Sequence, residues 1–174
     1  MPDAALDRLA GRAAYRARQF LRGLRPMLLA EEIADARGRL SPAEFTLFLH
    51  AEPRDRRHAC DLLHALRREG VSEAALVAAL LHDVGKGRLS VWSRVLFVLA
   101  TAASPRLVPA LAAEDGPRWR RELWRLQHHA RLGAAMLREA GSDARVVEIV
   151  ARHTGAPPPD DRELARFIEV DDRL

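Results

Sequence analysis

The feature that most constrains the fold is an apolar segment that ends in two adjacent metal-ligand side chains. Residues 73–81 read Glu-Ala-Ala-Leu-Val-Ala-Ala-Leu-Leu, almost wholly strong helix formers and apolar nearly all round, which is typical of a buried helix. His82 and Asp83 follow directly, and Gly85 supplies a helix end. Because adjacent helical residues point about 100° apart, one ion can take both ligands only near such an end. The sequence therefore predicts a deeply placed His-Asp pair.

Apolar residues recur every three or four positions through most of the chain, whereas alternating runs bounded by turn residues are missing. This pattern predicts an all-α fold, a compact multi-helix bundle. The 174 residues are 48% hydrophobic, enough for one core. We expect basic helices in residues 1–52 that pack on a core of residues 53–174, as one compact domain overall. The expected helices span residues 4–24, 27–37, 42–50, 54–69, 72–83, 90–102, 104–113, 117–128, 130–140, 143–153 and 161–174.

Charge and cysteine content narrow the function classes. The 28 basic and 24 acidic residues give a net charge of +4, and the basic residues are spread along the whole chain, which disfavours nucleic-acid binding. Cys60 is the single cysteine, so no intrachain disulfide can form, and no secretory signal pattern precedes the helices. We therefore expect a cytoplasmic protein. The apolar run 95–103 is about half the ~20 residues that span a bilayer, so we expect a buried helix there and no integral membrane segment.

Lys86 is the single lysine among the 28 basic residues, and it lies three positions after Asp83. The planar guanidinium of arginine does not replace the compact point charge of an ammonium group. We interpret Lys86 as a functional group, with chance placement of one lysine as the alternative.

The other histidines decide whether a metal site can form. His58 lies on an apolar helix face, whereas His64 lies about 240° further round, so only one of them can face a common site. His129 precedes Gly133, which permits close helix approach, and His153 ends an apolar helix. Each histidine alone is more often a core or surface residue than a ligand. Together they are spread over separate helices, as a polynuclear metal site requires.

These residues resemble the pattern of the HD-domain metal-dependent phosphohydrolases: a histidine, then His-Asp, optionally two further histidines, then a terminal aspartate. The resemblance covers about residues 55–174. His58 matches the first histidine, His82 and Asp83 match the name-giving pair, and residues 84–86 match its frequent continuation. It implies the HD-domain bundle as the fold.

The later part of the pattern leaves two assignments open. His129 and His153 match the two optional histidines, and in this respect the chain is especially similar to the symmetrical diadenosine tetraphosphate hydrolases of bacteria. His128 is the alternative to His129 for the first of these two histidines, and the spacing to the following glycine favours His129. For the terminal aspartate we favour Asp172 over Asp171, because apolar residues lie four and five places before it.

The resemblance implies a centre of two divalent ions bridged by Asp83. A metal-bridged hydroxide would attack phosphorus in line, and Lys86 would bind the substrate and neutralise charge on the phosphoryl oxygens. Nitrogen and oxygen ligands admit iron, manganese, cobalt, nickel or zinc. The implied metal ligands are His58, His82, Asp83, His129, His153 and Asp172.

We expect the partner to be a small-molecule phosphate ester, a nucleotide or dinucleotide being the first choice. The chain lacks the Gly-Tyr-Pro segment of cyclic-dinucleotide phosphodiesterases and the acidic residues that follow His-Asp in alarmone hydrolases. The insert 89–127, with Trp92, Trp119 and Trp124, is a candidate pocket wall, although packing is the commoner role of tryptophan. Two alternatives are a non-catalytic HD module that binds metal or nucleotide in signalling and an arginine-rich nucleic-acid binder.

Overall fold

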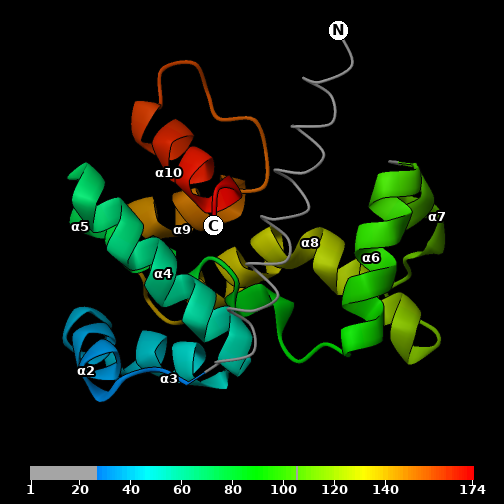
Figure 1. The fold of residues 1–174 in the computed structure, drawn as a ribbon, viewed down its shortest axis with the longest axis horizontal. Helices are drawn as coiled ribbons and strands as arrows, with labels where there is room; N and C mark the ends of the chain where they lie inside the picture. The colour runs from blue at the N-terminus through cyan, green and yellow to red at the C-terminus, as the bar shows by residue number, and fades with distance from the viewer. Residues whose placement is uncertain (1–26, 105) are drawn as a thin grey trace, which may run out of the picture.

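The computed structural model describes residues 27–104 and 106–174, and these residues form helices and turns without a β-strand (Figure 1). The all-α prediction is confirmed. The expected helix 4–24 lies outside the described residues. The elements are α2 (Ala30–Arg39), α3 (Pro42–His50), α4 (Pro53–Glu69), α5 (Glu73–Leu81), the short 3₁₀ helix η1 (Val84–Lys86), α6 (Val91–Ala103), α7 (Leu107–Leu111), α8 (Arg118–Glu139), α9 (Ala144–Arg152) and α10 (Arg162–Asp172).

Local capping signals set two of the helix starts. Glu44 N donates to Ser41 Oγ at 3.3 Å, and Ser41 N donates to Glu44 Oε2 at 2.8 Å, which is a reciprocal capping box with Pro42 at the first helical position. Ser72 caps α5 in a similar way, because its Oγ accepts from Ala75 N at 3.2 Å. Both starts lie where the sequence places them, within one residue.

The largest difference from the predicted boundaries lies in α8, since the other described helices begin and end within about three residues of their predicted ends. The sequence pattern predicts separate helices over 117–128 and 130–140, but α8 runs unbroken through both. Gly133 in a helix interior costs about 1 kcal/mol relative to alanine. Here its backbone packs tightly against the turn after α5, since a Cβ at Gly85 would lie 2.5 Å from Gly133 N. A tertiary contact therefore makes a helix-weakening residue part of a continuous helix.

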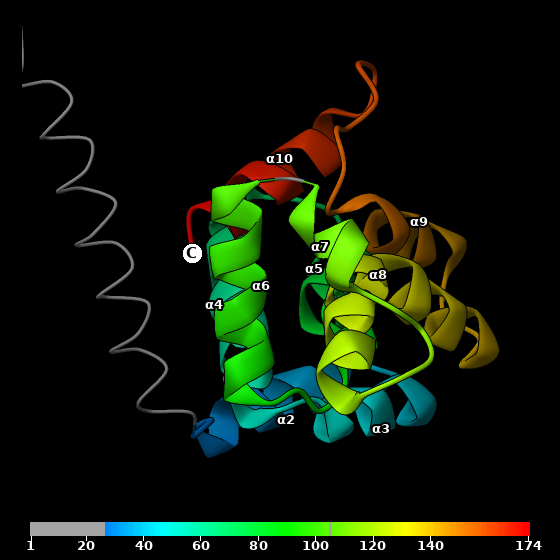
Figure 2. The ribbon, with the colours of Figure 1, turned by 90° about the vertical axis from the view of Figure 1, so that its right-hand side faces the viewer.

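The main core surrounds α5. Every residue of α5 from Ala75 to Leu81 is buried, and α5 packs against α4 and α9. α10 contacts α4 and α5 and closes one end of this body (Figure 2). The buried helix expected from residues 73–81 is confirmed.

α6 and α7 form a separate lobe, defined here as residues 91–111, to one side of that body (Figure 1). α6 and α7 pack on each other and on α8. The expectation of a buried helix over 95–103 is wrong in large part, because Leu99 is 62% exposed and Val95 and Val98 are also exposed. Trp92 is 81% exposed and is no packing residue. Even so, no helix in the described part of the chain is long and apolar enough to cross a membrane.

Candidate metal centre

Side chains from separate helices converge next to the end of α5. His58 comes from α4, His129 from α8, and His153 directly follows α9. The last member, Asp171, comes from α10. The group that meets is His58, His82, Asp83, His129, His153 and Asp171.

The end of α5 places two of these ligands in the interior. α5 ends at Leu81, and the backbone turns at Asp83, which has φ −99° and ψ 0°, before η1 begins. These angles lie in the sparsely occupied bridge region that is frequent at active sites. His82 is 1% exposed and Asp83 is 5% exposed, so the pair lies as deep as the sequence predicts.

Gly85 allows the turn to reach α8. A Cβ at this position would lie 2.0 Å from His129 O and 2.5 Å from Gly133 N, both backbone atoms that cannot move aside cheaply. Only glycine therefore permits η1 to pack directly on α8. This contact brings Asp83 within reach of His129.

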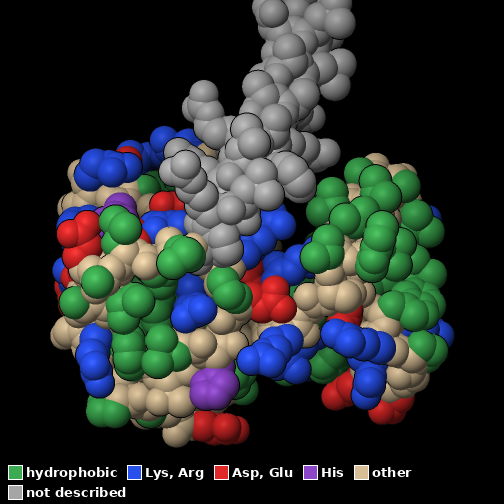
Figure 3. All heavy atoms as spheres, turned by 60° about the horizontal axis from the view of Figure 1, so that its bottom comes forward, with side chains coloured by type: hydrophobic (Ala, Val, Ile, Leu, Met, Phe, Trp, Pro, Cys, Tyr) green, Lys and Arg blue, Asp and Glu red, His purple; other side chains and the backbone are tan. Residues whose placement is uncertain are grey.

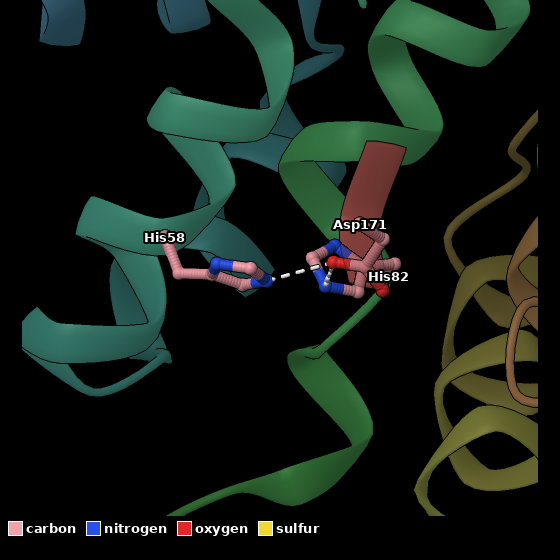
Figure 4. A group of neighbouring side chains, drawn as sticks. All are labelled: His58, His82 and Asp171. Atoms are coloured by element: carbon pink, nitrogen blue, oxygen red, sulfur yellow. Dashed lines mark hydrogen bonds and ion pairs between the residues drawn. The ribbon is translucent and has the colours of Figure 1, made fainter. Parts of the chain in front are cut away.

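The first group of ligand atoms joins α4, α5 and α10 (Figure 4). His58 Nε2 lies 2.9 Å from Asp171 Oδ1, and His82 Nε2 lies 3.7 Å from the same oxygen. A ligand atom from each of the three residues lies within 4.8 Å of the others. Two imidazole nitrogens and one carboxylate oxygen at this spacing can hold a divalent ion.

The structure corrects the choice of the terminal aspartate. Asp171 faces His58 and His82, whereas Asp172 lies at an exposed position on α10. The spacing explains the difference: Leu164 and Phe167 are fully buried, and Asp171 follows them by seven and four residues, on the same helix face. That stripe was the sequence signal that favoured Asp171.

The second group of ligand atoms surrounds Oδ1 of Asp83. Asp83 Oδ1 lies 3.4 Å from His129 Nε2 and 4.0 Å from His153 Nε2, and these two nitrogens are 3.2 Å apart. His82 also lies beside Asp83, with 3.4 Å between its Nε2 and Asp83 Oδ2. Asp83 Oδ1 is buried and has no hydrogen-bond partner. A buried carboxylate oxygen without a donor, facing two imidazole nitrogens, fits a cation ligand.

Backbone contacts orient three of the histidines. The Nδ1 atoms of His82, His129 and His153 lie 3.0, 2.7 and 2.8 Å from the carbonyl oxygens three residues earlier. A carbonyl only accepts, so each Nδ1–H donates, and Nε2 of the neutral ring keeps its lone pair. All three Nε2 atoms then point into the site as ligands, which is how metal-binding histidines are usually held.

The charges of the site depend strongly on burial. Burial lowers the pKa of His82, but the carboxylates of Asp83 and Asp171 outweigh it and raise this pKa to about 9. Burial and the neighbouring charge of His82 lower the pKa of His153 to about 3. Burial alone would raise the pKa of Asp171, yet His82 and His58 hold it at about 2. Two carboxylates thus remain ionised beside a positively charged His82, and a bound cation would displace the Nε2 proton of His82 and compensate the carboxylates in its place.

Of the other residues considered in the sequence analysis, one lies in the site and two lie outside it. Lys86 Nζ donates to Asp83 Oδ2, so the single lysine is part of the site. His64 lies outside it, since its Nε2 is 3.4 Å from Glu32 Oε1 on α2. His128 also lies outside: its ring packs on Trp124, with 4.7 Å between centroids.

The sequence reasoning missed Arg125 as a supporting residue. Arg125 Nε donates to Gly85 O at 2.9 Å and so braces the turn that carries Lys86. Arg125 lies four residues before His129, on the same face of α8, and this spacing is visible in the sequence.

The comparison with known families agrees with the geometry. The family described as HD domain matches residues 24–174, a span that also includes α2 and α3. No curated protein and no solved structure matches the chain. HD domains form a superfamily of metal-dependent hydrolases, and this chain has histidine and aspartate clusters whose spacing could hold a metal ion. The chain belongs to the HD-domain family.

Proposed function

We propose that this protein is a metal-dependent phosphohydrolase that cleaves a phosphate ester or anhydride of a nucleotide or dinucleotide. The observation that carries the proposal is the position of Asp83. Its Oδ2 lies beside His82, and its buried Oδ1 faces His129 and His153 without a hydrogen bond. A carboxylate placed between two groups of imidazoles is suited to bridging two cations.

Each side chain then has a defined task. Asp83 would serve both ions, the trio His58, His82 and Asp171 would hold one ion, and His129 with His153 would hold the other. Divalent cations bound here supply Lewis-acid activation of the phosphoryl group and of the attacking water. The ligand set of nitrogen and oxygen atoms suits iron, manganese, cobalt, nickel or zinc.

Lys86 would contact the reacting phosphoryl group of the substrate. Its ammonium lies beside Asp83 Oδ2 and is partly exposed, whereas Asp83 itself is buried. Stabilising negative charge on the phosphoryl oxygens is the main task left to the protein in phosphoryl transfer. Lys86 is placed to do this where the buried centre meets solvent.

Support for a nucleotide substrate comes from the histidine pattern. His129 and His153 lie side by side, with ring centroids 5.1 Å apart, and they match the two histidines in the resemblance to the symmetrical diadenosine tetraphosphate hydrolases. We therefore place dinucleoside polyphosphates first among the substrates to test.

The decisive experiment compares Asp83→Asn with His64→Ala as the matched control. Metal content of protein purified without chelator is measured by inductively coupled plasma mass spectrometry, and product release is measured on a panel of nucleotides and dinucleoside polyphosphates. We expect Asp83→Asn to lower turnover about 1,000-fold or more, because the bridge between the ions is lost. His64→Ala should keep both metal and turnover, since His64 pairs with Glu32 instead.

Two outcomes contradict the proposal in different ways. A wild-type protein that holds no transition metal would refute the metal centre. Bound metal without hydrolysis of any ester on the panel would instead favour a non-catalytic HD module that binds metal or nucleotide.

A further inference from the structure

An arginine-lined hollow of about 360 Å³ lies where the N-terminal half of α8 meets the segment that follows η1. Its volume falls in the range of small-molecule sites. Basic side chains gather on the face between the main body and the α6–α7 lobe (Figure 3). The residues that line the hollow are Arg88, Glu114, Arg118, Arg121, Glu122, Trp124 and Arg125.

The lining carries excess positive charge. It contains four arginines and two glutamates. Glu122 is already engaged, because Arg118 Nε donates to its Oε1 at 2.6 Å and Ser90 Oγ donates to its Oε2 at 2.6 Å. Arg88 and Arg121 are exposed, and no carboxylate in the described ranges 27–104 and 106–174 pairs with either. Two guanidinium groups thus remain available for an anion.

The hollow and the metal centre share one face of α8. Arg118, Glu122 and Arg125 precede His129 by eleven, seven and four residues, a spacing that puts them in one stripe along the helix. Arg118, Glu122 and Arg125 line the hollow, and His129 directs its Nε2 into the metal centre. Arg125 belongs to the hollow and lies one helical turn, about 6 Å, from His129.

The turn that carries Lys86 separates the two places. Arg125 Nε donates to Gly85 O at 2.9 Å, and a Cβ at Gly87 would lie 2.9 Å from the same nitrogen. The turn is therefore packed directly on Arg125. A ligand that reaches Lys86 from the hollow would meet Arg125 on the way.

We propose that this hollow binds the phosphate chain of the substrate, so that the enzyme acts on esters with two or more consecutive phosphates in preference to monophosphates. The inference rests on the proposed function for the reaction, but the binding site stands on its own geometry. Guanidinium groups bind phosphate oxygens in a planar, bidentate fashion, which suits Arg88 and Arg121 to the phosphates distal to the metal centre.

Trp124 forms a wall of the hollow. Its ring packs on His128, with 4.7 Å between centroids, and the guanidinium of Arg131 lies 6.0 Å from its centroid. The arginines of the hollow therefore carry the inference, which concerns the number of phosphates and not the base.

The test uses the full chain with the double substitution Arg88→Ala and Arg121→Ala. Arg138→Ala is the matched control, since it removes an exposed arginine of the same helix α8, about 25 Å from Arg121 along the helix axis. Isothermal titration calorimetry measures binding of adenosine monophosphate and of the non-hydrolysable imido analogue of adenosine triphosphate. We expect the double variant to bind the triphosphate analogue about 10-fold more weakly and the monophosphate within about twofold of wild type.

The outcomes separate this inference from the proposed function. An equal loss of affinity for both nucleotides, no loss for the triphosphate analogue, or a wild-type protein that binds neither would overturn the phosphate-chain site. A loss of affinity for the triphosphate analogue alone, in a protein that hydrolyses no ester, would support the phosphate-chain site and refute the proposed hydrolase activity. Hydrolysis with unchanged preference for polyphosphates in the double variant would refute the site alone.

Discussion

The body around α5 and the α6–α7 lobe are stabilised in different ways. In the body, helices bury apolar faces against one another, and the main core draws on residues 36–84 and 134–170. In the lobe, α6 leaves much of its apolar surface exposed, including Trp92 and Leu99. The body also contributes all six side chains of the candidate metal centre. A metal centre needs ligands held rigidly by packed helices, and the body supplies that packing.

Charged and polar contacts join the lobe to the body. Arg94 on α6 donates to both carboxylate oxygens of Asp55 on α4, at 3.0 and 2.7 Å, and to Glu52 at 3.3 Å. On the other side, Ser90 N donates to Glu122 of α8 at 3.2 Å. The lobe is therefore attached to the body by directional contacts in addition to buried apolar residues such as Ala100 and Val108.

The largest expected effect comes from removing a buried leucine of the body, in comparison with an exposed leucine of the lobe. Leu63→Ala in α4 removes a side chain that is 1% exposed, and we expect a loss of about 4 kcal/mol in the free energy of unfolding. Leu99→Ala is the matched change in α6, and its cost should stay within about 0.5 kcal/mol because the side chain already contacts water. Urea denaturation followed by circular dichroism measures both. Equal losses would mean that α6 buries its apolar face in solution.

The second effect concerns the contact between η1 and α8. Gly85→Ala places a Cβ on the backbone of His129, so we expect a loss of about 3 kcal/mol in unfolding free energy. Gly38→Ala is the control, since a Cβ there meets nothing within 4 Å, and the change should be neutral or stabilising. A Gly85→Ala protein as stable as wild type would refute the close packing of η1 on α8.

The third effect tests how the lobe is attached. Asp55→Ala leaves Arg94 without its bidentate partner, and we expect a loss of about 2 kcal/mol in the free energy of unfolding. This loss is smaller than for a fully buried pair because Arg94 is partly exposed. Amide hydrogen exchange should rise in α6 and stay unchanged in α5. The double change Asp55→Leu with Arg94→Met removes both charges and should restore most of the stability. Faster exchange in α5 as well would contradict a local role.

The smallest effect is a pH dependence within the body. Hydrogen bonds from Arg145, at 2.8 and 2.7 Å, lower the pKa of Asp161 from 3.8 to about 2. Because the folded-state pKa is the lower one, this contribution to stability is fully present above pH 3.8 and is lost as the pH falls through about 2. Asp161→Asn should therefore destabilise at neutral pH, and its difference from wild type should shrink in acid.

Asp160→Asn provides the control for that measurement, because Asp160 is the exposed neighbour of Asp161. Denaturation curves at neutral and acidic pH are recorded for both variants. A constant difference between Asp161→Asn and wild type across the whole pH range would show that the ion pair contributes nothing to the pH dependence.

Predictions from the sequence succeeded where local pattern alone decides the structure. The composition of residues 73–81 indicated a buried helix, and the helical angle between His58 and His64 indicated that only one of them faces inward. The predictions failed where burial depends on neighbouring helices. The apolar run of α6 indicated burial, but burial depends on whether another helix covers that face.

The sequence by itself determined most of the helices and the depth of the His82–Asp83 pair, because side-chain type and helical period act over a few residues. Only the tertiary structure decided that Asp171 completes the first group, that Gly85 packs on His129, and that Arg88 and Arg121 line one hollow. Those outcomes depend on distances between segments far apart in the chain, and such distances follow from how whole helices pack.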